Sequence, residues 1–75
     1  MEVDVNMEVD VNRLQDLREA RALSQRELAA LAGVGHNTIY RIERGYTKVL
    51  PRTVRKLARA LEVEPLDLIV RKEQT

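Results

Sequence analysis

The 75-residue sequence predicts an all-α protein, a compact bundle of about five short helices. It contains no Trp or Phe, so a core must be built from Leu, Ile, Val and Ala side chains. Signals for the start and the end of a helix recur along the chain, and the apolar residues between them repeat at spacings of three and four. A chain of this length forms one domain with a small core, which association with a second copy would help to stabilise.

The chain begins with the hexapeptide MEVDVN written twice, over residues 1–12. This segment has four acidic side chains and no basic one. Because termini are usually loose unless other elements hold them, we expect a mobile acidic segment outside the domain. The alternative is an extended strand that pairs with its counterpart in a second protomer, since the even repeat would place every Met and Val on one face.

The domain itself is expected over residues 13–70, and residues 71–75 are expected to fray. Its first helix covers about residues 13–22, and Asn12 is a suitable N-cap because its side-chain oxygen can accept a bond from a free N–H of the first turn. The apolar residues of this helix that are expected to turn inward are Leu14 and Leu17.

The stretch from Ser24 to Gly45 predicts two helices joined by a tight turn. Ser24 and Glu27 have the spacing of a capping box, in which each side chain bonds a backbone N–H that the first turn leaves free. Gly33 is expected to end the first of these helices, because glycine readily takes the left-handed conformation found just past a helix end. The apolar residues between these signals follow helical spacing and are Leu28, Ala29, Leu31 and Ala32.

The second helix of the pair is expected over about residues 36–44, opened by Gly35 and closed by Gly45. Ile39 and Ile42 lie three apart and therefore share the face that packs on the rest of the domain. The opposite face carries amides, a hydroxyl and arginines, which are groups that hydrogen-bond to base edges and phosphates. This helix is therefore predicted to be the recognition helix for double-stranded DNA.

Three residues of the recognition helix are candidates for reading bases. Asn37 and Arg41 lie four apart, and asparagine can bond adenine while arginine can bond guanine, each through two hydrogen bonds. His36 falls in the first turn, at the end expected to lie deepest in the major groove. A metal or catalytic role for His36 is disfavoured, because the sequence has no second His and no Cys. The residues of this helix expected to contact the DNA backbone are Thr38, Tyr40 and Arg44.

The segment from Leu17 to Gly45 reads LREARALSQRELAALAGVGHNTIYRIERG. It resembles the phage-repressor-type (Cro/repressor-like, xenobiotic-response-element type) helix-turn-helix family. The resemblance implies a lambda-repressor-like DNA-binding domain. It implies that Gln25 contacts a backbone phosphate and braces the recognition helix. The base contacts that it implies are the same three: His36, Asn37 and Arg41.

The resemblance further implies that Arg18 pairs with Glu43, the glutamate of the Glu-Arg-Gly sequence that ends the recognition helix. If both groups are partly buried, each needs the other, because removing one leaves a desolvated charge at a cost of about 3–5 kcal/mol. The alternative is a solvent-exposed pair worth less than about 1 kcal/mol.

Pro51 suits the first position of a further helix over about residues 51–61. Lys48, Arg52 and Thr53 lie at or just before the N-terminus of this helix, where contact with DNA phosphate is expected. Three more basic residues fit a phosphate-binding rim and an ordinary solvated face about equally well, namely Arg55, Lys56 and Arg59. The inward-facing residues of this helix are expected to be Val54, Leu57, Ala58 and Leu61.

A short final helix is expected over about residues 65–70, with more apolar surface than so short a helix can hide. In the family that the chain resembles, the last helix forms a two-fold dimer, which would place two recognition helices about 34 Å apart. The alternative is that these residues only cover the core of the monomer. The residues expected at the dimer interface are Pro65, Leu66, Ile69 and Val70.

The net charge of +1 hides an asymmetry, because residues 13–75 hold thirteen basic and eight acidic side chains. A basic domain suits a DNA partner. The sequence has no Cys, no apolar run of membrane-spanning length and no visible nucleophile–base pair. We therefore expect a cytoplasmic protein that is not an enzyme and has no cofactor, metal site or membrane partner.

Together these observations predict a sequence-specific transcription regulator, a repressor that binds an inverted-repeat operator as a homodimer. The alternative function is that of an antitoxin or another protein-interaction module that also binds its own promoter. In that alternative, the acidic segment at residues 1–12 would bind a basic protein partner.

Overall fold

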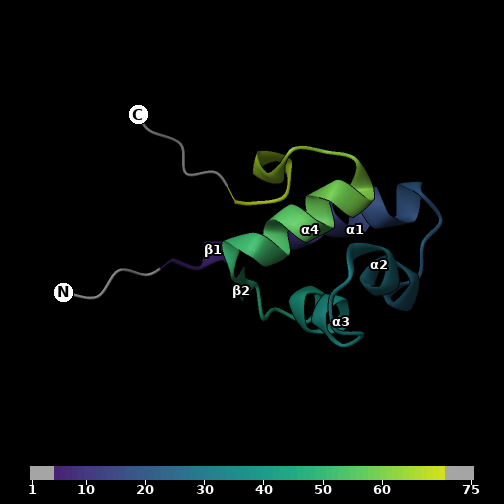
Figure 1. The fold of residues 1–75 in the computed structure, drawn as a ribbon, viewed down its shortest axis with the longest axis horizontal. Coiled ribbons are helices and arrows are strands. Elements are labelled where there is room, and N and C mark those ends of the chain that lie inside the picture. The colour runs from purple at the N-terminus through teal and green to yellow at the C-terminus, as the bar shows by residue number, and fades with distance from the viewer. Residues whose placement is uncertain (1–4, 71–75) are drawn as a thin grey trace.

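The computed structural model describes residues 5–70, which form a small helical bundle with a two-stranded sheet at one side (Figure 1). In Figure 1, α4 crosses the middle of the molecule, α3 lies at the lower edge beside α2, and the C-terminal turn lies at the upper edge. In chain order the elements of the described residues are β1 (Met7–Glu8), α1 (Val11–Ala20), α2 (Gln25–Ala32), α3 (Thr38–Glu43), β2 (Lys48–Val49), α4 (Pro51–Leu61) and the 3₁₀ turn η1 (Pro65–Asp67).

The expected bundle of about five helices is confirmed for four of them, and α4 has the predicted bounds. The fifth is a single 3₁₀ turn, because the chain after η1 pairs with residues near β1 instead of continuing as a helix. The Asp10 N–H donates to the Leu68 carbonyl at 2.8 Å, and the Val70 N–H donates to the Glu8 carbonyl at 2.9 Å. These bonds pair residues 68–70 with residues 8–10, so the chain after η1 does not continue as a helix.

The second copy of the repeated hexapeptide belongs to the fold, so the predicted domain boundary at residue 13 is too late. β1 pairs antiparallel with β2, with Met7 opposite Val49 and Glu8 opposite Lys48. Val9 is only 1% exposed and lies in the core. The expected alternation of the Met and Val residues is present here, but the strand pairs within its own chain. The predictions for residues 1–4 and 71–75 concern positions outside the described residues.

Helix α1 begins two residues earlier than expected, and its N-cap is Asp10 instead of Asn12. The Asp10 backbone is extended, and its side chain accepts a hydrogen bond from the Arg13 N–H at 3.2 Å. Both Asp and Asn are good N-caps. Asp10 takes the role because it is the last residue that the pairing with Leu68 holds in an extended conformation, after which the chain is free to turn.

The core is built from aliphatic residues, and it differs from the prediction by including Val9 and by leaving Leu31 of α2 outside. Leu31 is 63% exposed, because the buried face of α2 is centred on Leu28 and Ala29 and Leu31 lies at its margin. Helical spacing alone does not decide which apolar residue at the margin of a face is covered. The fully buried residues of the described chain are Val9, Leu14, Leu28, Ala29, Ile39, Ile42, Val54, Leu57, Ala58, Leu61 and Leu68.

The capping box predicted for α2 is confirmed. The Ser24 hydroxyl accepts from the Glu27 N–H and the Glu27 carboxylate accepts from the Ser24 N–H, both at 2.9 Å. At the other end, Gly33 has φ of +72°, and the Val34 N–H donates to the Ala29 carbonyl. These bonds satisfy groups that a helix end leaves free, so α2 has the same bounds at both ends as the local signals indicate.

Candidate nucleic-acid interface

The recognition helix is α3, and it is shorter than expected. It covers Thr38–Glu43, while His36 and Asn37 lie in a turn before it, closed by a bond from the Thr38 N–H to the Gly35 carbonyl. No side chain caps this end, because Gly35 has none and Asn37 makes no capping bond. The two residues that were expected in the first turn of the helix, His36 and Asn37, therefore lie outside it. The two predicted core residues of the helix, Ile39 and Ile42, are both buried.

The outer face of α3 and the segment after it form two shallow hollows that share Arg41 and Tyr46. We call the first the tyrosine hollow; it is lined by Asn37, Tyr40, Arg41 and Tyr46. We call the second the lysine hollow; it is lined by Thr38, Arg41, Ile42, Tyr46, Lys48 and Val49. None of the described residues that line the two hollows carries a carboxylate.

Five residues that the sequence predicts to contact DNA line these two hollows, and a sixth, Arg44, lies beside them. Asn37 and Arg41 line the same hollow, and Thr38 and Lys48 line the hollow next to it. Tyr40 is about half exposed, and the Arg44 guanidinium lies over its ring at 5.7 Å from the ring centre. A cation at this distance is attracted to the ring face, so Tyr40 helps to position Arg44.

Tyr46 is a candidate contact that the sequence reasoning missed. Its side chain is 72% exposed, yet its N–H donates to the Arg41 carbonyl and the Gly45 N–H donates to the Ile42 carbonyl, both at 3.0 Å. These two bonds are those of a left-handed helix cap, with Gly45 at φ of +113°. An aromatic residue directly after a capping glycine was the sequence signal that could have identified it.

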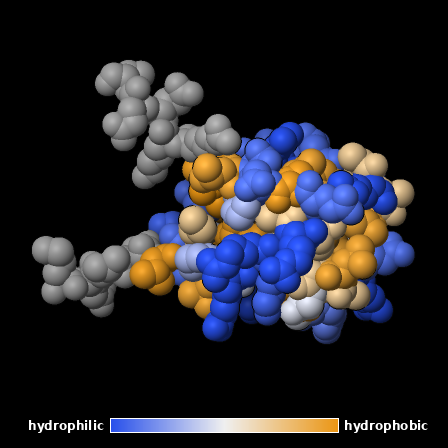
Figure 2. All heavy atoms as spheres, turned by 45° about the horizontal axis from the view of Figure 1, so that its top comes forward, coloured by the Kyte–Doolittle hydropathy of each residue, from blue (hydrophilic) through white to orange (hydrophobic). Residues whose placement is uncertain are grey.

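The remaining predicted DNA contacts are placed differently. His36 is exposed in the turn before α3, and Arg52 is exposed in the first turn of α4, beside the half-buried Thr53. The other three basic residues of α4 are exposed as well. Figure 2 shows the molecule with the top of Figure 1 turned toward the viewer. Hydrophilic side chains spread across the middle of this face, and hydrophobic ones form separate clusters around them.

Gln25 does not present its amide to solvent as a free phosphate ligand. Its Nε2 donates to Glu43 Oε1 at 2.7 Å, which ties the start of α2 to the end of α3. The expected bracing of the recognition helix is therefore present. A phosphate contact by this residue stays a prediction.

Arg18 and Glu43 form the expected ion pair, and it is the partly buried form. Arg18 Nε lies 2.8 Å from Glu43 Oε2 and Nη2 lies 3.1 Å from Oε1, so the guanidinium bonds both carboxylate oxygens. The two side chains are 13% and 4% exposed. Arg18 Nη1 also donates to the Leu23 carbonyl at 2.8 Å. The pair thereby connects α1, the loop before α2, and α3.

The surroundings of Glu43 keep it ionised. Burial by itself would raise the pKa of Glu43, but the hydrogen bonds from Arg18 and Gln25 outweigh this effect and hold that pKa below its ordinary value. The hydrogen bond to Glu43 in turn raises the pKa of Arg18. The negative charge of Glu43 is therefore neutralised within the protein instead of facing the outer surface of α3.

Residues 14–68 match the model of the helix-turn-helix family HTH_3. The chain belongs to this family. Its match begins at the first core residue of α1 and ends just after η1, so it includes the whole of the recognition helix and the ion pair behind it. None of the curated proteins matches the chain.

Among solved structures, the HTH_3 chain is similar to the restriction-modification controller protein C.AhdI from Aeromonas hydrophila. The two share 40% identity with a TM-score of 0.71, over 76% of this chain and 86% of that one. It is also similar to an HTH_3 family transcriptional regulator from Vibrio cholerae, with 35% identity and a TM-score of 0.69 over 76% of this chain and 32% of that one. These similarities support a DNA-binding regulatory protein.

A third similar structure is a hydroxyethylphosphonate dioxygenase, with 28% identity and a TM-score of 0.76. The match covers 91% of this chain but only 15% of the dioxygenase, so it concerns one part of a larger protein. Among residues 5–70 of the HTH_3 chain, no three His, Asp or Glu side chains are grouped so that they could hold a metal ion. No helix in the same range has the length and apolar character needed to span a membrane.

Proposed function

We propose that this chain is a sequence-specific DNA-binding regulator of transcription, and that it represses by binding an inverted-repeat operator as a homodimer. In this proposal α3 lies in the major groove, where Asn37 and Arg41 read base edges. Residues around them hold the DNA backbone, and no catalytic step is assigned to the chain. Because the operator lies on the DNA of the cell, the proposed place of action is the cytoplasm.

The observation that carries the proposal is the chemistry of the surface around α3. Amide, hydroxyl, guanidinium and ammonium groups line the two hollows, and the one carboxylate of α3 is paired with Arg18 behind them. A polyanion with hydrogen-bonding base edges is complementary to such a surface. The ion pair supports the proposal further, because it holds α3 rigidly against α1 and α2.

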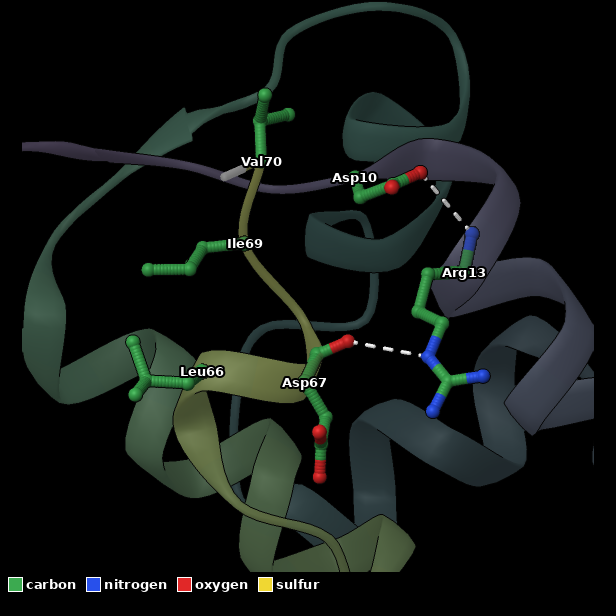
Figure 3. Close-up of a pocket in the computed structure, with 6 residues that line it drawn as sticks. All are labelled: Asp10, Arg13, Leu66, Asp67, Ile69 and Val70. Carbon is green, nitrogen blue, oxygen red and sulfur yellow. Dashed lines mark hydrogen bonds between the residues drawn. The ribbon is translucent and has the colours of Figure 1, made fainter. Parts of the chain in front are cut away.

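The proposed dimer contact is the apolar segment of residues 65–70. This segment is a 3₁₀ turn followed by non-helical chain, where the sequence predicts a regular helix. Leu66 is 58% and Val70 is 42% exposed, whereas Pro65 and Ile69 are partly covered by their own chain. Figure 3 shows Leu66 and Ile69 side by side on one side of this segment. Arg13 is on the other side, with its Nε donating to the Asp67 carbonyl at 3.2 Å. Exposed aliphatic groups beside a charged rim suit a two-fold contact with a second copy.

The first test is the selection of bound duplexes from a random DNA pool, followed by affinity measurements against salt. We expect enrichment of an inverted repeat with half-sites about ten base pairs apart, and a steep fall of affinity with salt. If no sequence is enriched and binding stays weak at low salt, the proposal is wrong. The search would then turn to a protein partner.

The second test compares two variants on the selected duplex. Arg41→Ala should lose about 1–3 kcal/mol of binding free energy on the cognate site and relax the preference at one base pair. Lys48→Ala should weaken binding to all sequences alike and reduce the salt slope by about one unit, because it removes a phosphate contact. If both variants change affinity uniformly, Arg41 does not read a base.

A further inference from the structure

The tyrosine hollow contains apolar surface that the proposed contacts do not use. Two phenol rings line it, from Tyr40 on the recognition helix and from Tyr46 just after it. Tyr46 is 72% exposed and packs little of its ring into the protein. Leaving a ring of this size in water forgoes the stabilisation that burying it would bring, which is a reason to look for a ligand that covers it.

The position of Tyr46 is fixed even though its side chain is exposed. The backbone bonds from Tyr46 to Arg41 and from Gly45 to Ile42 tie it to the last turn of α3. The ring therefore moves with the recognition helix, and in the proposed complex it enters the major groove with that helix. Tyr40 is anchored as well, since the Arg44 guanidinium lies over its ring.

The groups around the rings show which part of the DNA they would meet. Asn37 and Arg41, the proposed base-reading residues, line the same hollow as the two rings. The hollow is shallow and open to solvent, so it does not enclose a free small molecule. A small apolar group that projects from a larger ligand fits it better. In the major groove the C5-methyl group of a pyrimidine is such a group, and thymine carries it.

We propose that the tyrosine hollow binds the C5-methyl group of a pyrimidine in each operator half-site, next to the base pair that Arg41 reads. This inference rests on the proposed function. Tyr46 and Tyr40 cover the methyl group with their rings, while Asn37 and Arg41 bond the polar edges of neighbouring bases. Tyr46 is thereby a specificity-determining residue, and its contact is apolar in nature.

The test uses the full chain and the duplex selected from the random pool. Each thymine of the half-sites is replaced in turn, symmetrically, by deoxyuridine, which removes only the methyl group. At one position we expect a loss of about fourfold in affinity per half-site, and about sixteenfold for the two half-sites together. At that same position cytosine and 5-methylcytosine are compared, which separates the methyl group itself from thymine as its source.

Two variants identify the hollow as the site of this effect. Tyr46→Ala should bind the thymine duplex more weakly than the wild type does, and it should bind the thymine and uracil duplexes equally. Tyr46→Phe retains the ring and should keep the discrimination, which separates the ring from a hydroxyl contact with phosphate. Thermal melting of each variant checks the fold, which an exposed side chain is expected to leave intact.

The inference is wrong if no thymine position is sensitive to uracil, or if Tyr46→Ala discriminates as the wild type does. It is also wrong if Tyr46→Phe loses the discrimination together with Tyr46→Ala. Failure of the proposed function is a separate result, because the wild type would then select no duplex before any base is replaced.

Discussion

At the scale of single residues, the Glu43 carboxylate is the group on which the arrangement of the helices depends most. It accepts hydrogen bonds from Arg18, Gln25 and Gln15, the last at 3.4 Å. These donors come from α1 and α2, while Glu43 is the last residue of α3. A carboxylate that is 4% exposed and has these partners stabilises both the fold and the placement of the recognition helix.

Replacing Glu43 by Gln should lower the free energy of unfolding by about 3 kcal/mol, because it leaves the guanidinium of Arg18 partly buried without a charged partner. Glu19→Gln is the matched control. Glu19 lies 3.9 Å from the same guanidinium but is 67% exposed, so its removal should cost less than about 1 kcal/mol. Urea unfolding at pH 7 measures both. Equal effects would show that the burial of Glu43 contributes nothing.

The same residue predicts a dependence of stability on pH. The pKa of Glu43 is lower in the folded protein than in the unfolded chain, so its contribution is fully present above the unfolded value, about 4.3. The contribution is lost as pH falls through the lower, folded value. The melting temperature of the wild type should therefore fall more steeply below about pH 4 than that of Glu43→Gln. Parallel curves for the two proteins would contradict this assignment.

At the scale of elements, all four α-helices of residues 5–70 end close to a residue in the left-handed conformation or with positive φ. The sequence predicts two of these residues, Gly33 and Gly45, because glycine takes such angles without strain. The other two are Ala22 at φ of +55° and Glu62 at φ of +59°. Their side chains make the same backbone conformation less favourable.

Exchanging the residue types at two of these positions should have opposite effects. Ala22→Gly should raise the free energy of unfolding by about 0.5–1 kcal/mol, because relief of strain exceeds the added freedom of the unfolded chain. Gly33→Ala should lower it by a similar amount, although a Cβ at Gly33 has open space around it. Chemical denaturation of the two variants checks this. A gain in stability with Gly33→Ala would show that the conformation is not strained for alanine.

At the scale of the whole molecule, the proposed DNA-binding surface and the proposed dimer surface belong to different parts of the chain. The recognition helix and the C-terminal turn lie at opposite edges in Figure 1, with α4 between them. The second hexapeptide copy holds these parts together, because it pairs with β2 on one side and with residues 68–70 on the other. The proposed inverted-repeat operator requires a fixed relation between the recognition helix and the proposed dimer contact, and this small sheet would contribute to that relation.

The proposed dimer predicts the effect of charging its apolar surface. Leu66→Glu should convert the dimer to a monomer and weaken binding to the inverted repeat far more than binding to a single half-site. Leu31→Glu is the control, since Leu31 is exposed to a similar extent, 63% against 58%, but lies on α2. Sedimentation of each variant gives its oligomeric state. A dimer that survives Leu66→Glu would move the interface elsewhere.

The helices could be predicted because their signals are local. The Ser24–Glu27 capping box, the glycine at position 33 and the proline at position 51 act on backbone groups within one turn of themselves, so the bounds of α2 and α4 follow from neighbouring residues alone. The ion pair between Arg18 and Glu43 could be predicted for a different reason. It came from resemblance to a known family, since 25 residues separate the two partners.

Only the tertiary structure decided features that depend on segments far apart in the chain. Nothing local shows that Val9 is buried, because its strand gains partners only when β2 and residues 68–70 lie on either side of it. The same is true of Gln25, whose amide bonds Glu43, and of Tyr46, which lines a hollow with Asn37 and Arg41. Hydrophobic pattern and capping are properties of a short stretch, whereas burial and shared surfaces arise when distant stretches pack together.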